Sequence, residues 1–210
     1  MPGRGSRRRA AVLGHPVDHS LSPVLHLAAY QALGLDWSYE RVDVTPEDLP
    51  AFLDSLDESW AGLSLTMPLK RDVLPLLDEI DPVAAATGAV NTVLLGDGVR
   101  RGTNTDVRGL VVSLDEHGAA HGDAVVLGAG ATARSAVAAL ASRGSALVTA
   151  YVRRPEAADD LSRTATDVGV SLVVRPWADA GATWWTERIN TGRGDLTEMR
   201  RRIDAGPPRG

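Results

Sequence analysis

The chain has 210 residues, 44% of them hydrophobic and 23% charged, which is ordinary for a soluble globular protein. Its formal net charge of −5 argues against a nucleic-acid or anionic-membrane partner, and no segment approaches the length of a membrane span. Cysteine is absent, which excludes disulfides and fits a cytoplasmic protein, and the five histidines lack metal-ligand spacing, so no metal site is expected.

The first hundred residues alternate between short apolar runs and segments with helical spacing. The apolar runs predict strands at 10–14, 36–44 and 61–66. Helices are predicted over 23–34, after Thr45-Pro46, and from Asp81-Pro82 to Gly88. Residues 89–106 predict a hairpin with Asp97-Gly98 in its turn. This order indicates an α/β unit over residues 10–106.

A second unit of the same kind follows a linking helix at 107–121. Its strands are predicted at 124–127, 146–152 and 171–174, with a helix over 128–144 that opens on a glycine turn. No apolar run of strand length follows Val174, so the second unit, residues 122–178, is expected to be an incomplete sheet with an exposed edge. The tail, 179–210, is rich in Arg, Gly and Pro and is expected to be poorly ordered.

The glycine turn joins the first strand of the second unit to its helix. Gly128, Ala129, Gly130, Ala131 and Thr132, followed by alanine, fit G-x-G-x-x-G/A directly after a strand. There the first glycine lets the chain reverse, the second lets the backbone approach a pyrophosphate, and the helix N-terminus supplies free N–H groups. We therefore expect a Rossmann-like dinucleotide-binding unit. The alternative is a tight turn without a ligand.

The end of the next strand bears on the choice of nucleotide. A site for NAD would carry Asp or Glu there for the ribose 2′-hydroxyl, whereas this chain has Val152-Arg153-Arg154. Two guanidinium groups suit a 2′-phosphate, so the expected cofactor is NADP. The alternative is a solvated basic strand end.

Two serines, Ser20 and Ser22, precede the first predicted helix, in which Pro23 takes the first position. Hydroxyls and free N–H groups at a helix N-terminus favour an anion, so these serines are candidates for binding a carboxylate. Ser22 is also expected to be the N-cap of that helix. The spacing alone does not choose between binding and capping.

Lys70 is the only lysine in a chain with 21 arginines. Arginine keeps its proton at any useful pH, whereas burial can lower the pKa of a lysine enough for acid–base catalysis. Lys70 is therefore a candidate acid/base group, the alternative being chance placement in a surface loop. Asp106 lies just before the linking segment, where it can pair with Lys70 across a cleft between the units or cap a helix that starts near Val107.

Five sequence motifs occur in a set order: GHPVDHSLSP, LSLTMPLK, GAVNTV, GTNTD and GAGATAR. Together they resemble the NADP-dependent shikimate dehydrogenase family, from about Ala11 to about Trp177. The resemblance implies an oxidoreductase of chorismate and aromatic amino-acid biosynthesis, a monomer or homodimer, that reversibly reduces 3-dehydroshikimate to shikimate with NADPH. Its implied site residues are Ser20 and Ser22 for the substrate carboxylate, Thr66, Asn91 and Asp106 for the ring hydroxyls, and Lys70 as the acid/base group with Asp106 as its partner.

Two departures from the family pattern bear on activity. Ser64 stands where many members carry Asn in N-V-T-x-P. The only glutamine is Gln31, so the substrate-contacting Gln of the family's C-terminal helices has no counterpart, and the tail from about Gly181 matches nothing in the family. This pattern indicates a truncated or altered C-terminal end. The alternatives are a catalytically impaired remnant that binds a small hydroxy-carboxylate without turnover, and an enzyme that uses quinate.

Overall fold

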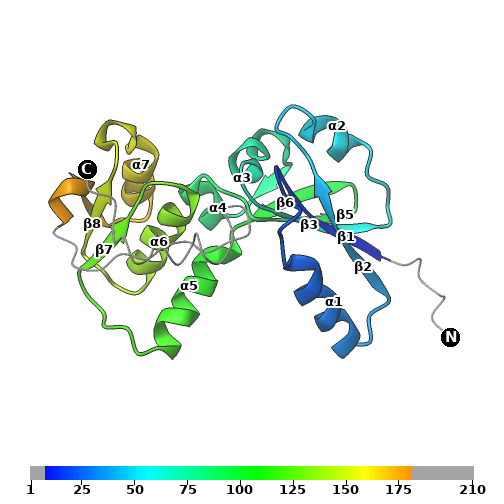
Figure 1. Ribbon diagram of the computed structural model, residues 1–210, viewed down its shortest axis with the longest axis horizontal. Helices are drawn as coiled ribbons and strands as arrows, with labels where there is room; N and C mark the ends of the chain where they lie inside the picture. The colour runs from blue at the N-terminus through cyan, green and yellow to red at the C-terminus, as the bar shows by residue number, and fades with distance from the viewer. Residues whose placement is uncertain (1–7, 181–210) are drawn as a thin grey trace, which may run out of the picture.

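The computed structural model describes residues 8–180, which form two lobes, each built on its own sheet (Figure 1). The strands of the first lobe are β1 (Arg8–Gly14), β2 (Trp37–Asp43), β3 (Trp60–Leu65), β4 (Glu79–Ile80), β5 (Thr92–Gly96) and β6 (Val99–Thr103). Those of the second lobe are β7 (Ala124–Leu127), β8 (Leu147–Val152) and β9 (Ser171–Pro176). The fold is α/β, with a second, smaller sheet, as the sequence predicted.

The first sheet has the strand order β2-β1-β3-β5-β6-β4. β1, β2 and β3 run parallel, and β5 is antiparallel to both β3 and β6, so β6 points the same way as β3. β1, which pairs with a strand on each side, is apolar and buried over most of its length, as expected for a strand covered on both faces. The helices of this part of the chain are α1 (Ser22–Ala32), α2 (Leu49–Asp54), α3 (Leu69–Asp72) and α4 (Pro82–Thr87), with the 3-10 turn η1 (Leu74–Leu76).

The second sheet is all parallel, in the order β7-β8-β9. Its helices are α5 (Thr105–Glu116), which leads into it, then α6 (Ala131–Ser142) and α7 (Asp159–Asp167), with the 3-10 turns η2 (Pro155–Ala157) and η3 (Trp177–Ala180). Val137 of α6 and Leu161 of α7 pack with Val148 of β8 in a fully buried core on one face of the sheet. On the opposite face of β7, Val125 and Leu127 are 62% and 57% exposed, because side chains alternate along a strand.

Local signals predicted several element ends correctly. Asp81 caps α4: its Oδ1 accepts a hydrogen bond of 2.6 Å from the N–H of Ala84, and Gly88 ends the helix with a φ of +55°. Asp97 and Gly98 have positive φ values of 54° and 72°, which gives the predicted hairpin turn between β5 and β6.

The predicted N-cap of the first helix is wrong. α1 begins at Ser22 itself, and Leu21 occupies the cap position without a side-chain hydrogen bond. The N–H of Ser22 instead donates to the Oγ of Ser20 at 3.3 Å. Three further elements, β4, α3 and α7, were not predicted, nor were the three 3-10 turns. The helix after Thr45-Pro46 is shorter than the pattern indicated.

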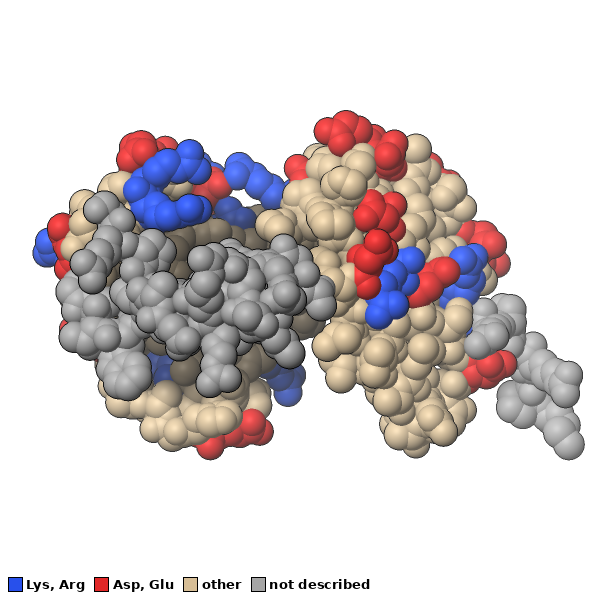
Figure 2. Space-filling model, in the orientation of Figure 1, with Lys and Arg blue, Asp and Glu red and all other residues tan. Residues whose placement is uncertain are grey.

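The surface of α1 is uncharged. The helix contains no Asp, Glu, Lys or Arg, and the lower part of the first lobe in Figure 2, where α1 lies, is nearly free of charged atoms. The groups that α1 itself offers to an anion are therefore neutral hydroxyls and N–H groups.

Membrane-spanning helices and metal-binding clusters are both absent from the described residues. In the range 8–180 no helix has the length and apolar character needed to cross a membrane, and no group of three or more His, Asp or Glu side chains could hold a metal ion. Most of the tail predicted at 179–210 lies outside the described residues, which end at Ala180.

Candidate active site

A cavity of about 380 Å³ opens at one edge of the first sheet. Parallel strands β1 and β3 end at this edge, β6 ends there too, and antiparallel β5 begins there, so the segments that follow or precede these strands converge. The lining side chains come from these segments: Val12, Val17, His19, Ser20, Ser22, His26, Ser64, Leu65, Thr66, Lys70, Asn91, Thr92, Thr105 and Asp106. All six of the predicted substrate and catalytic residues are among them.

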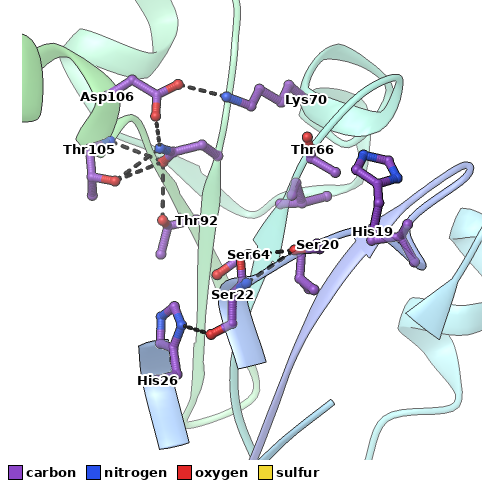
Figure 3. A pocket seen from close by; sticks show the side chains of 14 residues that line it. His19, Ser20, Ser22, His26, Ser64, Thr66, Lys70, Thr92, Thr105 and Asp106 are labelled. Carbon is purple, nitrogen blue, oxygen red and sulfur yellow. Dashed lines mark hydrogen bonds and ion pairs between the residues drawn. The ribbon is translucent and has the colours of Figure 1, made fainter. Parts of the chain in front are cut away.

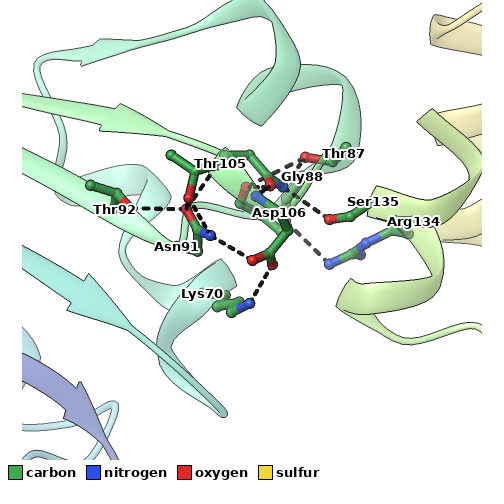
Figure 4. Close-up of polar contacts among 11 residues, drawn as sticks. Lys70, Thr87, Gly88, Asn91, Thr92, Thr105, Asp106, Arg134 and Ser135 are labelled. Carbon is green, nitrogen blue, oxygen red and sulfur yellow. Dashed lines mark hydrogen bonds and ion pairs between the residues drawn. The ribbon is translucent and has the colours of Figure 1, made fainter. Parts of the chain in front are cut away.

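Lys70 and Asp106 form an ion pair at one end of the cavity (Figure 4). Lys70 lies on the short helix α3, and its Nζ donates to the Oδ2 of Asp106, in the first turn of α5, at 2.6 Å. The two side chains are 19% and 31% exposed, so the pair is shielded from bulk water yet reachable from the cavity. The alternative that Asp106 caps α5 is wrong, because Asn104 does so through its Oδ1, which accepts from the N–H of Asp106 at 3.0 Å.

Asn91 fixes the other oxygen of the Asp106 carboxylate. Its Nδ2 donates to Asp106 Oδ1 at 2.6 Å. Its Oδ1 accepts from the Oγ1 of Thr92 and from the N–H of Thr105, both at 3.0 Å, which sets the orientation of the amide. Both oxygens of Asp106 therefore have a donor, and the carboxylate is held in one orientation toward Lys70.

Hydroxyl groups line the opposite end of the cavity, as Figure 3 shows. Ser20 Oγ donates to Ser22 Oγ at 3.1 Å, and Thr66 lies between them and Lys70 in this view. The cavity thus has a neutral, hydroxyl-rich end and an end with a lysine and a carboxylate. Such a cavity suits a small molecule with an acid group at one side and a hydroxyl or carbonyl at the other.

Three further residues support the hydroxyl end and were not predicted as site residues. Tyr39 is buried and its OH donates to Ser64 Oγ at 2.7 Å; burial raises the pKa of Tyr39 above its usual value. The His26 ring stacks on Tyr39 with 4.1 Å between centroids, and its Nδ1 lies 2.9 Å from the carbonyl oxygen of Ser22. Because a carbonyl only accepts, this Nδ1 carries a hydrogen. The available sequence signal for this contact was the position of His26, four residues after Ser22.

Asn104 is a buried junction between the lobes that the sequence reading also missed. Besides capping α5, its Nδ2 donates to Thr87 Oγ1 (2.9 Å), to the carbonyl oxygen of Ala89 (3.0 Å) and to Ser135 Oγ (3.1 Å). Thr87 ends α4 and Ser135 lies on α6, so one side chain ties both helices to the first turn of α5. That turn carries Asp106.

The glycine turn has the backbone that a dinucleotide site requires. Gly128 follows β7 with a φ of +104°, which side chains disfavour, and Gly130 precedes α6 with no side-chain cap. A Cβ at Gly130 would meet no atom of residues 8–180 within 4 Å, so these residues leave room beside the turn. Ala129, Ala131 and Thr132 complete the turn. These features fit a pyrophosphate.

The two arginines of the predicted nucleotide site come to the same edge as the glycine turn. The N–H of Gly128 donates to the carbonyl of Tyr151 at 2.9 Å, which places the turn beside the end of β8. Val152 closes β8 and is 3% exposed, whereas Arg153 and Arg154 follow it and are exposed. Their guanidinium groups are thus available to an anion near the turn.

Comparison with known proteins gives the same picture. The model of the shikimate dehydrogenase substrate binding domain matches residues 12–93. The curated shikimate dehydrogenase (NADP(+)) of Moorella thermoacetica is 42% identical over 182 residues, which are 85% of this chain and 62% of that protein. The solved shikimate dehydrogenase of Mycobacterium tuberculosis is 39% identical with a TM-score of 0.75, over 82% of this chain and 66% of that one. The chain belongs to the shikimate dehydrogenase family.

Two further relatives show what share of a family member's length this chain covers. The shikimate dehydrogenase (NADP(+)) of Thermus thermophilus is 46% identical over 137 residues, 65% of this chain and 52% of that protein. A solved structure from the same organism, in complex with NADP(H) and shikimate, is 40% identical with a TM-score of 0.71 over 79% of this chain and 62% of that one. The chain therefore spans a little over half the length of the curated shikimate dehydrogenases that it matches.

Proposed function

We propose that this chain is an NADP-dependent shikimate dehydrogenase, which interconverts shikimate and 3-dehydroshikimate in the biosynthesis of chorismate and the aromatic amino acids. The observation that carries the proposal is the 2.6 Å ion pair between Lys70 and Asp106 at one end of a cavity whose other end is lined by serine hydroxyls. The family membership given above supports the choice of substrate.

The substrate carboxylate would bind at the hydroxyl end of the cavity. Ser20 and Ser22 offer hydroxyl donors there, at the N-terminus of an uncharged helix, where an anion is favoured. Thr66, Asn91 and Asp106 would bind the ring hydroxyls. With the carboxylate held at one end, the carbon that is oxidised or reduced comes to lie beside Lys70.

Proton transfer would take place at Lys70. A bound NADPH would supply the hydride for reduction of the substrate carbonyl. Lys70 Nζ would donate a proton to the oxygen as negative charge develops on it, and its positive charge stabilises that oxygen before transfer. Asp106 Oδ2 accepts from the same Nζ and keeps it aimed at the cavity, and the amide of Asn91 holds Asp106 in place. In the reverse direction Lys70 accepts the proton.

NADP would bind to the second lobe. The turn from Gly128 to Thr132 would hold the pyrophosphate, and the strand end from Val152 to Arg154 would hold the adenosine, with the two arginines at its 2′-phosphate. In this proposal residues 10–106 are the substrate-binding and catalytic domain, 107–121 the linking helix and 122–178 the cofactor-binding part. A relative in Listeria monocytogenes, 26% identical, was solved with shikimate and NAD, so the ratio of kcat/KM for NADP+ and NAD+ is the measurement that decides the nucleotide.

The proposal is tested by adding shikimate and NADP+ to the purified chain and following the absorbance of reduced nicotinamide. We expect turnover by the native chain and a fall of about 100-fold or more in kcat for Lys70→Arg, because arginine keeps the charge but cannot release the proton. Arg71→Lys, the matched exchange at the next residue of α3, should leave most of the activity. A flat trace from folded native protein would refute the dehydrogenase proposal. Calorimetry would then show whether shikimate binds without turnover.

Quinate is a second candidate substrate. A quinate dehydrogenase of Corynebacterium glutamicum, solved in complex with NAD, is 31% identical with a TM-score of 0.75 over 81% of this chain. In this chain Ser64 takes the place of the Asn found in many relatives, and its Oγ already accepts from Tyr39, so the hydrogen of Ser64 is free to donate to a substrate hydroxyl. The same assay with quinate decides: a higher kcat/KM for quinate than for shikimate would make this a quinate dehydrogenase.

A further inference from the structure

A single carboxylate, that of Asp160, lies where the two lobes meet on the side of α3. Asp160 belongs to α7 of the second lobe. Its Oδ2 accepts from Arg71 of α3 in the first lobe and, at 3.2 Å, from Arg134 of α6. Its Oδ1 accepts from Arg163, three residues on along α7, at 3.1 Å. Three guanidinium groups from three helices therefore share one counter-ion.

Because the Arg134 side chain is buried, its guanidinium needs Asp160 as a counter-ion. The Arg134 side chain is 8% exposed, and this burial lowers the pKa of its guanidinium, which Asp160 partly offsets. A buried cation without a partner carries a large desolvation penalty. The guanidinium has one other hydrogen bond, from Nη2 to the carbonyl oxygen of Gly88 at 3.3 Å, which Figure 4 shows. Arg134 is thus fixed between α4 and α7.

Two of the three arginine partners of Asp160 lie next to the two proposed functional centres. Arg71 follows Lys70 directly on α3. Arg134 lies in the first turn of α6, and its N–H donates to the carbonyl of Gly130 in the glycine turn at 3.1 Å. Among residues 8–180, the Arg71–Asp160 pair is the only ion pair or hydrogen bond that joins α3 to α6, α7 or the second sheet.

We propose that Asp160, through Arg71 and Arg134, is a positioning residue that fixes α3 and its Lys70 at a constant distance from the glycine turn. The inference rests on the proposed function, since it assigns these side chains the task of keeping the proton donor and the dinucleotide site in register. The Lys70–Asp106 pair orients the amine toward the first turn of α5, and the Arg71–Asp160 pair joins α3 to α7. None of the three residues of the link touches the substrate cavity.

Two arginines on the same carboxylate give a matched test. Arg71 and Arg163 are 62% and 66% exposed, and both pair with Asp160, but only Arg71 crosses between the lobes. We expect Arg71→Gln to lower kcat about threefold or more, with the KM for shikimate changed by less than about twofold, because misplacing a reacting group lowers the rate more than binding. Arg163→Gln should leave both constants within about twofold. Arg71→Lys should restore most of the loss, since it keeps the charge.

A direct readout of lobe position makes the test independent of activity. The chain has no cysteine, so Ala51→Cys on α2 and Ala157→Cys in η2, both exposed, give two unique sites for spin labels. We expect the distance distribution between them to broaden in Arg71→Gln and to stay unchanged in Arg163→Gln. Asp160→Asn should broaden it further. Asp167→Asn, on the same helix, is its control, and thermal unfolding shows whether each variant is folded.

The outcomes separate this proposal from the proposed function. Equal distributions and equal kcat values for folded Arg71→Gln and Arg163→Gln would overturn the positioning role. If the native chain does not turn over shikimate, the dehydrogenase proposal fails, while the spin-label distances still decide whether Asp160 holds the lobes.

Discussion

Replacing Asn104 by Ala should destabilise the protein more than the loss of a helix cap explains. Asn104 is 5% exposed, caps α5, and gives its amide hydrogens to Thr87, Ala89 and Ser135. Losing the cap costs about 1 kcal/mol. Leaving buried partners of the amide without a donor adds about 1–3 kcal/mol. We therefore expect the free energy of unfolding to fall by about 2–4 kcal/mol in total.

Asp81→Ala is the control, because Asp81 caps α4 and, among the described residues, its side chain has only the one bond to the N–H of Ala84. This variant should lose about 1 kcal/mol. Urea unfolding followed by circular dichroism gives both values with the same slope of free energy against denaturant if the unfolded states are alike. If Asn104→Ala costs no more than Asp81→Ala, the buried amide cluster does not hold the two lobes together and our reasoning about it is wrong.

Two further predictions concern the glycine turn and a histidine near the cavity. Gly130→Ala should keep native stability, since Gly130 has a φ of −76° and no atom of residues 8–180 lies within 4 Å of an added Cβ. The same change should weaken NADP+ binding about tenfold or more in calorimetry, because the methyl group blocks the pyrophosphate. Gly128→Ala should lower stability as well, because Gly128 has a φ of +104°. His15 Nδ1 lies 2.6 Å from Asp43 Oδ1, and this hydrogen bond, followed by the charge of Asp43, raises the pKa of His15. Any stability from the pair is then present below the unfolded pKa of about 6.5 and is lost as the pH rises through the folded pKa. An NMR titration should show the His15 pKa fall in Asp43→Asn, and an unchanged value would contradict the pairing.

Features with a local cause could be predicted from the sequence. The cap at Asp81 and the turn at Asp97-Gly98 depend on residues a few positions apart, and the structure has both. Ser22 failed as a cap because α1 begins at Ser22 itself, so its hydroxyl belongs to the first helical residue and accepts from Ser20 Oγ. Helix α7 was missed because its sequence, DDLSRTATD, is mostly polar. Its buried Leu161 and Ala165, four residues apart, were the only sign of a helical face.

Contacts between distant segments could be predicted only where residue choice was unusual. The single lysine among arginines drew attention to Lys70, and the structure has it paired with Asp106, 36 positions away. Arg71 and Asp160 are 89 positions apart and are common residue types, so no pattern in the sequence marks them as partners. The buried position of Arg134 likewise follows from the packing of α6 against α4 and α7, which the sequence alone does not specify.

The central claim is that the amine of Lys70 transfers a proton to and from the substrate. Its most direct test is the oxidation of shikimate by Lys70→Ala in the presence of increasing concentrations of a small primary amine. We expect kcat to fall about 100-fold or more in the variant and to rise again with amine concentration, because the free amine replaces the missing group in the cavity. Turnover by folded Lys70→Ala at the rate of the native chain, without added amine, would contradict the account.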